Sequence, residues 1–341
     1  MLLVKYLKKL LTINTYGKLR DLKGYLNQKS YCTSISSKKH FWFLDAPDYG
    51  NIGDQAIAYA TKLFLSENYS EFDIIEIQQS QIIKYLNWLK NNINESDIIV
   101  LQGGGNFGNL YPPYEAIRRK IVQTFSNNKI IIFPQSVYYT NDIKGNYEIK
   151  VAKKIYNKDN IVIFAREKNS YNRLKALFPN VEVGLCPDIV FYLYGRINVE
   201  KKNGLGICLR NDSEKIEFNE NQVCFIDNKI KCYKNINYID TICSNNNINS
   251  QNREQIVYNK IMEFAVNELV LTDRLHGMIF SFISKTPCVF FPSKTGKANF
   301  IYETWLSNSN MISDYKEPQS EIIEEDYTFD FTVLKNAISR N

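Results

Sequence analysis

The sequence predicts an α/β fold with two doubly wound parallel sheets, one in each half of the chain, facing each other across a cleft. Short continuous apolar runs of strand length alternate with helical segments, which is typical of a parallel sheet covered on both faces. This alternation stops in a polar stretch at 194–203 and then starts again. The length of 341 residues also suits two domains, because single cores rarely grow beyond roughly 250–300 residues.

Six apolar runs in the first half are expected to form strands. These runs are 40–47, 72–77, 97–102, 129–136, 161–167 and 181–188. The helices expected between them cover 55–68, 80–92, 114–126, 147–157 and 168–178. Ligands of doubly wound sheets bind beyond the carboxyl ends of the strands. The glycine-containing turns at 50–54 and 103–108 are therefore candidate binding segments.

The second half repeats the alternation. Its expected strands are 204–210, 268–273 and 287–291, with a helix at 253–267. The chain is therefore expected to have three parts. These are a basic amphipathic N-terminal segment at 1–40, a first domain at 41–195 and a second domain at 196–341.

The composition excludes several classes of protein. The 44% hydrophobic content excludes wholesale disorder. With 42 Lys and Arg against 36 Asp and Glu, the formal charge of +6 is too small to predict nucleic-acid binding. Seven scattered cysteines without a CxxC pair predict reduced thiols in a cytoplasmic protein. The only histidines are His40 and His276, so a His-rich metal site is excluded and no metal is expected.

The first 20 residues are basic and apolar. Lys5, Lys8 and Lys9 interrupt the stretch that a signal peptide would keep uncharged, and no segment reaches the ~20 apolar residues of a spanning helix. Leucines at helical spacing predict an amphipathic helix. The favoured interpretation packs this helix on the body of the protein. The alternative is a peripheral contact of residues 1–20 with the inner face of the membrane.

Two glycine-rich turns each have two interpretations. Gly103, Gly105 and Gly108 spell GxGxxG after a strand, but Pro112 delays the next helix and the next strand ends without an acid for a ribose. A dinucleotide site is therefore disfavoured. The run is either a cradle for an anion or hydroxyl, or a tight turn. In the turn at 50–54, the favoured role of Asp54 is a helix cap, and the alternative is to accept sugar hydroxyls.

The segment 272–277, TDRLHG, is the sharpest cluster of reactive residue types. It follows an apolar strand and opens an apolar helix, which places Arg274 and His276 at a carboxyl edge near a helix N-terminus. Such a position favours anions and a neutral imidazole. Arg166 ends a strand at the matching edge of the first half. Two arginines could bind one anionic ligand together. The alternative is that each arginine only forms an ion pair at the surface.

Seven segments in order resemble the polysaccharide pyruvyl transferase family, over about residues 41 to 305. They are GNIGDQAI, LQGGGNFGNLY, FPQS, FAREKNSYNRLK, PDIVF, ICLRND and LTDRLHGMIFSF. The resemblance implies two Rossmann-like domains of glycosyltransferase-B type. It also implies transfer of the carboxyvinyl group of phosphoenolpyruvate to two hydroxyls of one sugar, which leaves a cyclic pyruvate ketal and phosphate. The only donor is then phosphoenolpyruvate, and no cofactor is expected.

The resemblance also implies roles for individual residues. Arg166, Arg274 and His276 match the positions tied to phosphoenolpyruvate. The reaction needs a proton at the vinyl carbon, and because His40 precedes the first strand, His276 is the expected donor. Lys297 is a further candidate for holding phosphate. The whole set of expected substrate-binding residues is Leu275, Asn51, Asp54, Gly104, Gly105, Asn106, Gln135, Ser136 and Lys297. One departure is Asn109, where many relatives have an aspartate after the glycine.

Three functions remain open from the sequence. The leading hypothesis is a ketal pyruvyl transferase acting on a capsule, exopolysaccharide or cell-wall glycan precursor, with a lipid-linked saccharide as acceptor. The second is a nucleotide-sugar glycosyltransferase of the same architecture. The third is a non-catalytic, membrane-associated polysaccharide assembly protein, for which Arg166 and His276 would have no shared purpose.

Overall fold

The computed structural model describes residues 12–31, 35–197, 202–212, 215–243, 247–316 and 326–340. The chain divides into two compact units. Unit 1 comprises Met1–Asp48, Thr61–Ile189 and Phe331–Asn341, and unit 2 comprises Tyr49–Ala60 and Val190–Asp330.

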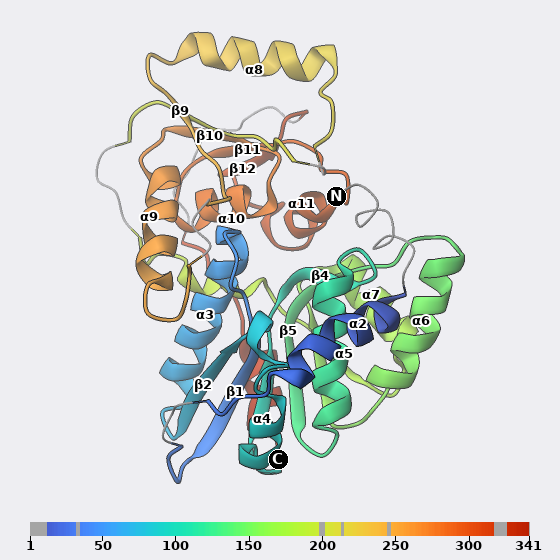
Figure 1. Ribbon diagram of the computed structural model, residues 1–341. Coiled ribbons are helices and arrows are strands. Elements are labelled where there is room, and N and C mark those ends of the chain that lie inside the picture. The colour runs from blue at the N-terminus through green and yellow to red at the C-terminus, as the bar shows by residue number, and fades with distance from the viewer. Residues whose placement is uncertain are drawn as a thin grey trace. The chain divides into compact units, whose positions relative to one another are not determined.

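Unit 1 is built on a seven-stranded parallel sheet within the described residues (Figure 1). Its strand order is β2-β1-β3-β5-β6-β7, with β4 paired to β5. The strands are β1 (Lys39–Ala46), β2 (Phe72–Gln78), β3 (Ile98–Leu101), β4 (Gly104–Gly108), β5 (Lys129–Tyr138), β6 (Ile161–Ala165) and β7 (Glu182–Leu185). Because β1 and β5 are buried along nearly their whole length, both faces of this sheet must be covered.

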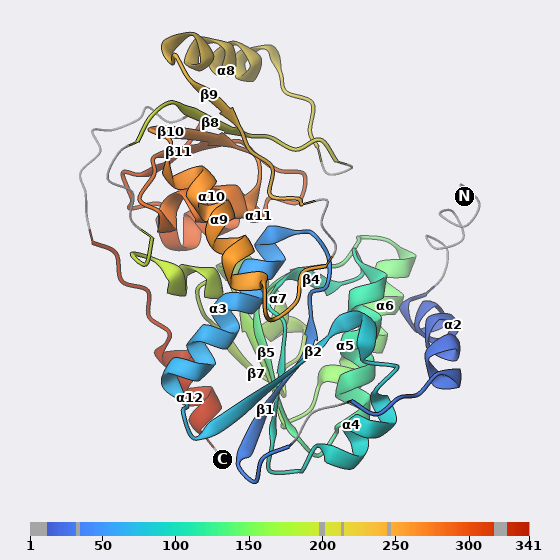
Figure 2. The same cartoon turned by 60° about the vertical axis from the view of Figure 1, so that its left-hand side comes forward.

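Helices cover both faces of the unit 1 sheet. Figure 2 shows α5 and α6 on one side of it and α3 and α12 on the other. The helices of this part of the chain are α2 (Ile13–Leu26), α3 (Ile52–Asn68), α4 (Leu86–Asn92), α5 (Pro112–Thr124), α6 (Ile143–Tyr156), α7 (Lys168–Leu177) and α12 (Thr332–Ser339). The core on the α5 side includes Ile121, Ile132 and Leu44. Helix α2 packs on the outside of α5.

Local signals in the sequence explain where several helices begin. Asp142 caps α6 by accepting a hydrogen bond from the backbone N of Gly145 at 2.6 Å. Glu167 caps α7 through the backbone N of Ser170 at 2.9 Å. Helix α5 begins with two prolines, whose fixed φ suits a first turn where no amide donor is required.

Unit 2 has a five-stranded parallel sheet of order β12-β11-β10-β8-β9 among its described residues. Its strands are β8 (Leu205–Cys208), β9 (Ile236–Tyr238), β10 (Leu269–Thr272), β11 (Cys288–Phe290) and β12 (Ile312–Asp314). Its helices are α8 (Glu220–Cys232), α9 (Arg253–Ala265), α10 (Leu275–Ile283) and α11 (Lys297–Ile301). Helix α8 covers one face, and α9 and α10 cover the other (Figures 1 and 2).

Each sheet reverses its strand order at one point. In unit 1, β2 lies on one side of β1 and β3 on the other; in unit 2, β9 and β10 flank β8 in the same way. Such a switch point opens a crevice at the carboxyl ends of the two central strands, and ligands of doubly wound folds bind there. The two switch points are therefore where binding residues are expected.

The predicted fold class, α/β with two Rossmann-like doubly wound sheets, is confirmed. Some details differ. The stretch at 80–92 contains a short 3-10 turn and only the seven-residue α4, and the glycine run at 103–108 forms β4.

The expected division between residues 195 and 196 would give two units that follow one another along the chain. The compact units instead interleave, because unit 1 includes the C-terminal segment Phe331–Asn341 and unit 2 includes Tyr49–Ala60. The C-terminal helix belongs to unit 1, since Phe331 packs against Phe64 at 5.9 Å between ring centroids and Tyr69 donates to the carbonyl of Lys335. Residues 1–11 of the expected N-terminal helix lie outside the described ranges. Among the helices that the structure describes, none has the length and hydropathy needed to cross a bilayer.

Candidate active site

Residues 272–277 connect β10 to α10 at the switch point of unit 2. The Thr272 hydroxyl donates to the carbonyl of Cys208 at 2.8 Å and accepts from the backbone N of Arg274 at 3.1 Å. A Cβ at Gly277 would stand 2.3 Å from Thr272 Oγ1, so only glycine allows the helix to start this close to the strand. The sequence TDRLHG thus fixes Arg274 at the N-cap of α10 and places His276 in its first turn.

Carboxylates surround the Arg274 side chain in unit 2. Its Nη1 lies 3.3 Å from Asp212 Oδ2, and its Nη2 lies 3.0 Å from Asp240 Oδ1. Asp212 also pairs with Arg210 Nε at 3.4 Å. Arg274 is buried, and its Nε has no hydrogen-bond partner among the described residues. One donor of this guanidinium is therefore left for a ligand.

His276 lies directly against the turn at 50–54, which belongs to the same unit. A Cβ at Gly53 would stand 2.2 Å from His276 Nδ1, so this position must be glycine for the imidazole to keep its place. The turn is itself anchored in unit 2, because the backbone N of Ile52 donates to the carbonyl of Thr241 at 2.8 Å. The structure thus joins two segments that are more than 200 residues apart in the sequence.

The polar residues of this turn have local partners. Asn51 Oδ1 accepts from the backbone N of Gly53 at 3.0 Å. Asp54 lies in the first turn of α3 and accepts from the Tyr49 hydroxyl at 3.0 Å. Asn51 therefore bonds to a backbone N–H at the start of α3, next to Asp54, for which the sequence predicts a capping role.

Arg166 lies at the carboxyl edge of the unit 1 sheet, just after β6. Its Nη1 pairs with Asp188 Oδ2 at 2.7 Å, and its Nε donates to Ser136 Oγ at 2.8 Å. Arg166 and Asp188 are both almost fully buried. The motifs FPQS and PDIVF therefore supply side chains that orient this guanidinium, a role that the sequence did not reveal for Asp188.

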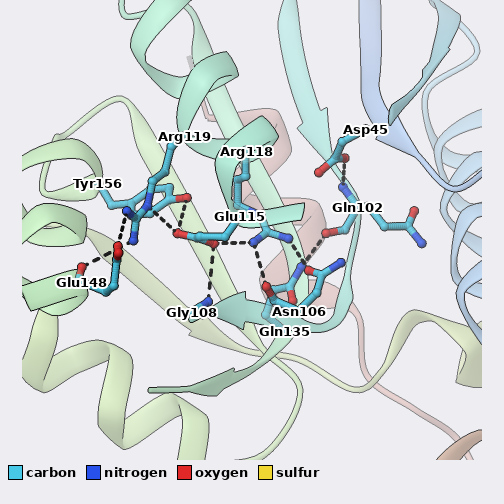
Figure 3. Close-up of polar contacts among 10 residues, drawn as sticks. All are labelled: Asp45, Gln102, Asn106, Gly108, Glu115, Arg118, Arg119, Gln135, Glu148 and Tyr156. Carbon is cyan, nitrogen blue, oxygen red and sulfur yellow. Dashed lines mark hydrogen bonds and ion pairs between the residues drawn. The ribbon is translucent and has the colours of Figure 1, made fainter. Parts of the chain in front are cut away.

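Neutral amides and one carboxylate line the unit 1 switch point (Figure 3). Asp45, near the end of β1, accepts from the backbone N of Gln102 at 2.7 Å, and Gln135 Nε2 donates to the carbonyl of Gln102 at 2.5 Å. Gln102 directly follows β3. Burial raises the pKa of Asp45 to about 7, against an opposing effect of Arg118. Sequence reasoning missed Asp45 and Gln102; the signal was only that each is a polar residue ending an apolar strand.

A buried ionic network lies beside these amides on the α5 side of the sheet (Figure 3). Glu115 pairs with Arg118 at 2.7 Å and with Arg119 at 3.0 Å, and Arg119 pairs with Glu148 at 2.7 Å. Arg118 also donates to the side chain of Asn106 in β4. The spacing of 115, 118 and 119 along one helix is the sequence signal for such pairs. This network holds Asn106 in place.

The other predicted substrate-binding residues lie on both units. Gly104, with φ of 123°, begins β4 opposite Gln135, and Gly105 and Asn106 follow it. Lys297 is the first residue of α11, in unit 2. Leu275 begins α10. The structure thus places Leu275, Arg274, His276, Asn51 and Asp54 in unit 2, and Gly104, Gly105, Asn106, Gln135, Ser136 and Arg166 in unit 1.

The comparison with known families identifies the chain. Residues 51–295 match the family model described as polysaccharide pyruvyl transferase. The chain belongs to this family. It is therefore a transferase, and membership of the family implies a polysaccharide acceptor.

The chain is also similar to related proteins and, in its fold, to a solved structure. The pyruvyl transferase is 34% identical over 282 residues to General stress protein 30 of Bacillus subtilis, covering 82% of this chain and 81% of that protein. It is 28% identical over 276 residues to Pyruvyl transferase 1 of Schizosaccharomyces pombe, covering 76% and 68%. A functionally uncharacterised protein of Klebsiella pneumoniae shares the fold, with a TM-score of 0.51 and 20% identity over 91% of this chain and 98% of that one.

Proposed function

We propose that this pyruvyl transferase moves the carboxyvinyl group of phosphoenolpyruvate to two hydroxyls of one sugar in a capsule, exopolysaccharide or cell-wall glycan precursor. The products are a cyclic pyruvate ketal and phosphate. The observation that carries the proposal is the position of Arg274 and His276 in the N-terminal turn of α10, at the switch point of unit 2.

The chemistry of the donor suits this position. Phosphoenolpyruvate carries a carboxylate and a phosphate, and helix N-termini and guanidinium groups both favour anions. The unpartnered Nε of Arg274 is a buried donor that such an anion would satisfy. Lys297, in the same unit, is the proposed additional cation for the phosphate.

His276 is proposed to protonate the methylene carbon while a sugar hydroxyl attacks C2. General acid catalysis of this kind contributes roughly 10²–10⁴-fold to a rate. Phosphate then leaves and takes up, through solvent, the proton that the first hydroxyl releases. The second hydroxyl captures the resulting oxocarbenium-like carbon and gives its proton back to His276. Gly53 supports this role because its lack of a side chain lets the backbone pack against the imidazole and fix its orientation.

Arg166 is proposed as a second cation for phosphoenolpyruvate. Its ion pair with Asp188 and its bond to Ser136 orient the guanidinium before a ligand arrives. That Arg166 and Arg274 grip one donor molecule stays a prediction. Isothermal titration of phosphoenolpyruvate into Arg166→Ala and Arg274→Ala tests each residue separately, and an unchanged affinity removes that residue from the donor site.

Acceptor binding is proposed for the amides of unit 1. Asn106, Gln135 and the backbone of Gly104 and Gly105 gather at one edge of the sheet. Neutral amides are suited to sugar hydroxyls, because they both donate and accept hydrogen bonds.

We further propose a lipid-linked acceptor in the cytoplasm and a peripheral membrane contact of residues 1–20. On α2, close to this segment, Leu22, Tyr25 and Leu26 are exposed at helical spacing, as expected of an interfacial helix. Co-sedimentation of the full chain with anionic liposomes, compared with a Leu22→Ser/Leu26→Ser chain, tests whether the apolar surface continues onto α2. Equal pelleting of both chains contradicts a contribution of α2.

The decisive experiment measures products. The protein is incubated with phosphoenolpyruvate and a panel of p-nitrophenyl glycosides and lipid-linked saccharides, and phosphate release and the saccharide mass are followed. The expected product is heavier by one ketal-linked pyruvate. A parallel reaction with UDP-sugars tests glycosyl transfer, and a saccharide heavier by one sugar, with release of UDP, would overturn the proposal.

A further inference from the structure

Asp45 has an unusual backbone conformation at the carboxyl end of β1. Its φ is 67°, in the left-handed region that few residues other than glycine adopt. The pairing of β1 with β2 also shifts register between Leu44 and Ala46, so Asp45 is displaced from the regular ladder. Strained conformations and bulges of this kind concentrate at functional sites.

The carboxylate of Asp45 lies beside a buried acceptor oxygen that lacks a donor. Asp45 is 6% exposed, and its Oδ1 accepts from the backbone N of Gln102. The fully buried Gln135 donates to the carbonyl of the same Gln102, and its own Oε1 is without a donor in the described ranges. Buried oxygens are rarely left unpaired, and a sugar hydroxyl would supply the missing donor.

The charged groups that face Asp45 come from α5. Arg118 favours the carboxylate and Glu115 opposes it, while burial is the largest influence and raises the pKa to about 7. A carboxyl that titrates near the working pH can both accept and release a proton during turnover. The network of Arg118 with Glu115 and Asn106 holds this environment in place.

We propose that Asp45 is the general base that accepts the proton of the acceptor hydroxyl attacking C2. This inference rests on the proposed ketal pyruvyl transfer. As the new C–O bond forms, the hydroxyl proton passes to Asp45, and the methylene carbon gains its proton as in the proposed function. The bond between C2 and the phosphate oxygen then breaks, and phosphate takes one proton from solvent. Asp45 returns its proton to solvent, and the second hydroxyl recharges His276.

The test is Asp45→Asn in the full chain. Asparagine tolerates a positive φ and can still accept from the backbone N of Gln102, so the fold should persist. We expect kcat to fall roughly 10²–10⁴-fold, with unchanged affinity for phosphoenolpyruvate. In the wild type, we expect kcat to decrease as the pH falls below about 7. This acidic limb of the pH profile should be absent in Asp45→Asn. Wild-type turnover with the same acidic limb in Asp45→Asn would overturn the proposal.

A matched control and a binding measurement separate this idea from the proposed function. Asp97→Asn removes another buried carboxylate of unit 1, at the amino end of β3, and should leave the acidic limb in place. Saturation-transfer NMR with the p-nitrophenyl glycosides is run without phosphoenolpyruvate. If the wild type binds a saccharide but does not pyruvylate it, the proposed reaction is overturned. If that binding is also weaker in Asp45→Asn, the contact of Asp45 with the saccharide is supported. If the wild type neither binds nor pyruvylates any of them, both proposals fail.

Discussion

The two switch points share one topology and carry opposite chemistry. In unit 1, Asp45 lies near the end of β1 and Gln102 directly follows β3, and they present carboxylate and amide groups. In unit 2 the strands β8 and β10 lead into Arg210, Arg274 and His276. The repeated fold thus supplies only the position of a binding edge. The residues that end the strands decide whether the edge suits hydroxyls or anions.

The two units also use their arginines differently. In unit 1, Arg118 and Arg119 are buried in ion pairs with Glu115 and Glu148. In unit 2, the carboxylates beside Arg274 are those of Asp212 and Asp240, which are 31% and 54% exposed. Water screens such partly exposed pairs. The ion pairs of Arg118 and Arg119 therefore hold structure, whereas Arg274 has weaker partners that a ligand can replace.

The largest expected effect comes from His276→Ala. If His276 is the proton donor, turnover falls roughly 10²–10⁴-fold while the far-UV circular dichroism is unchanged. The matched control is His40→Ala, because the chain has only two histidines. His40 is buried at the amino end of β1, where its Nδ1 lies 3.5 Å from Asp97 Oδ1. The His40→Ala variant should therefore lose stability and keep its turnover per folded molecule.

Gly53→Ala sharpens the same measurement. The added Cβ would overlap His276 Nδ1 and displace the imidazole. Turnover should therefore fall, though less than in His276→Ala, while every reactive group is retained. Normal turnover in His276→Ala would remove the proton donor from the mechanism.

The next expected effect is on stability and is confined to unit 1. Glu115→Ala leaves two buried guanidinium groups without their shared carboxylate, which typically costs about 3–5 kcal/mol. Hydrogen exchange should show lost protection in α5 and α6, with α9 and α10 protected as before. Glu263→Ala is the control from unit 2, where the pair with Lys260 is half exposed and is worth about 0–1 kcal/mol. Equal destabilisation by the two variants would contradict the contrast between the units.

The elements that could be predicted from the sequence are those with a strong local pattern. Periodicity and neighbouring residues in the chain are enough to recognise the apolar runs that form β1, β5 and β10, and also the TDRLHG turn. The order of the strands, and hence the switch points, depends on contacts between distant segments and could not be read locally.

The missed residues have the same explanation. Asp45 matters because β1 bulges beside Gln102, which is 57 residues away, and Gly53 matters because it meets His276. Asp188 orients Arg166 across 22 residues. No local pattern marks a residue whose partner lies elsewhere in the chain. Arg274 and His276 could be placed at a helix N-terminus from the sequence because the helix that positions them begins beside them.

The smallest expected effect is a gain in stability from Asp45→Asn, with a definite dependence on pH. In the folded protein, burial raises the pKa of Asp45 from its ordinary 3.8 to about 7. The folded state therefore binds more protons than the unfolded state between these values, and its stability falls as the pH rises through this window. Above pH 7 the wild type must keep a buried carboxylate ionised, which costs on the order of a few kcal/mol.

Asparagine removes that cost, so the melting temperature of Asp45→Asn should exceed that of the wild type by several degrees at pH 8 and approach it near pH 4.5. The control, Asp97→Asn, keeps one acceptor oxygen where Asp97 uses one oxygen for the Trp42 indole and the other for the backbone N of His40, so it loses one of these bonds and should be less stable at both pH values. A gain for Asp45→Asn that did not grow between pH 4.5 and 8 would contradict the raised pKa. A gain that does grow, together with a loss of turnover, would show that this edge keeps a destabilising carboxylate where the chemistry requires it.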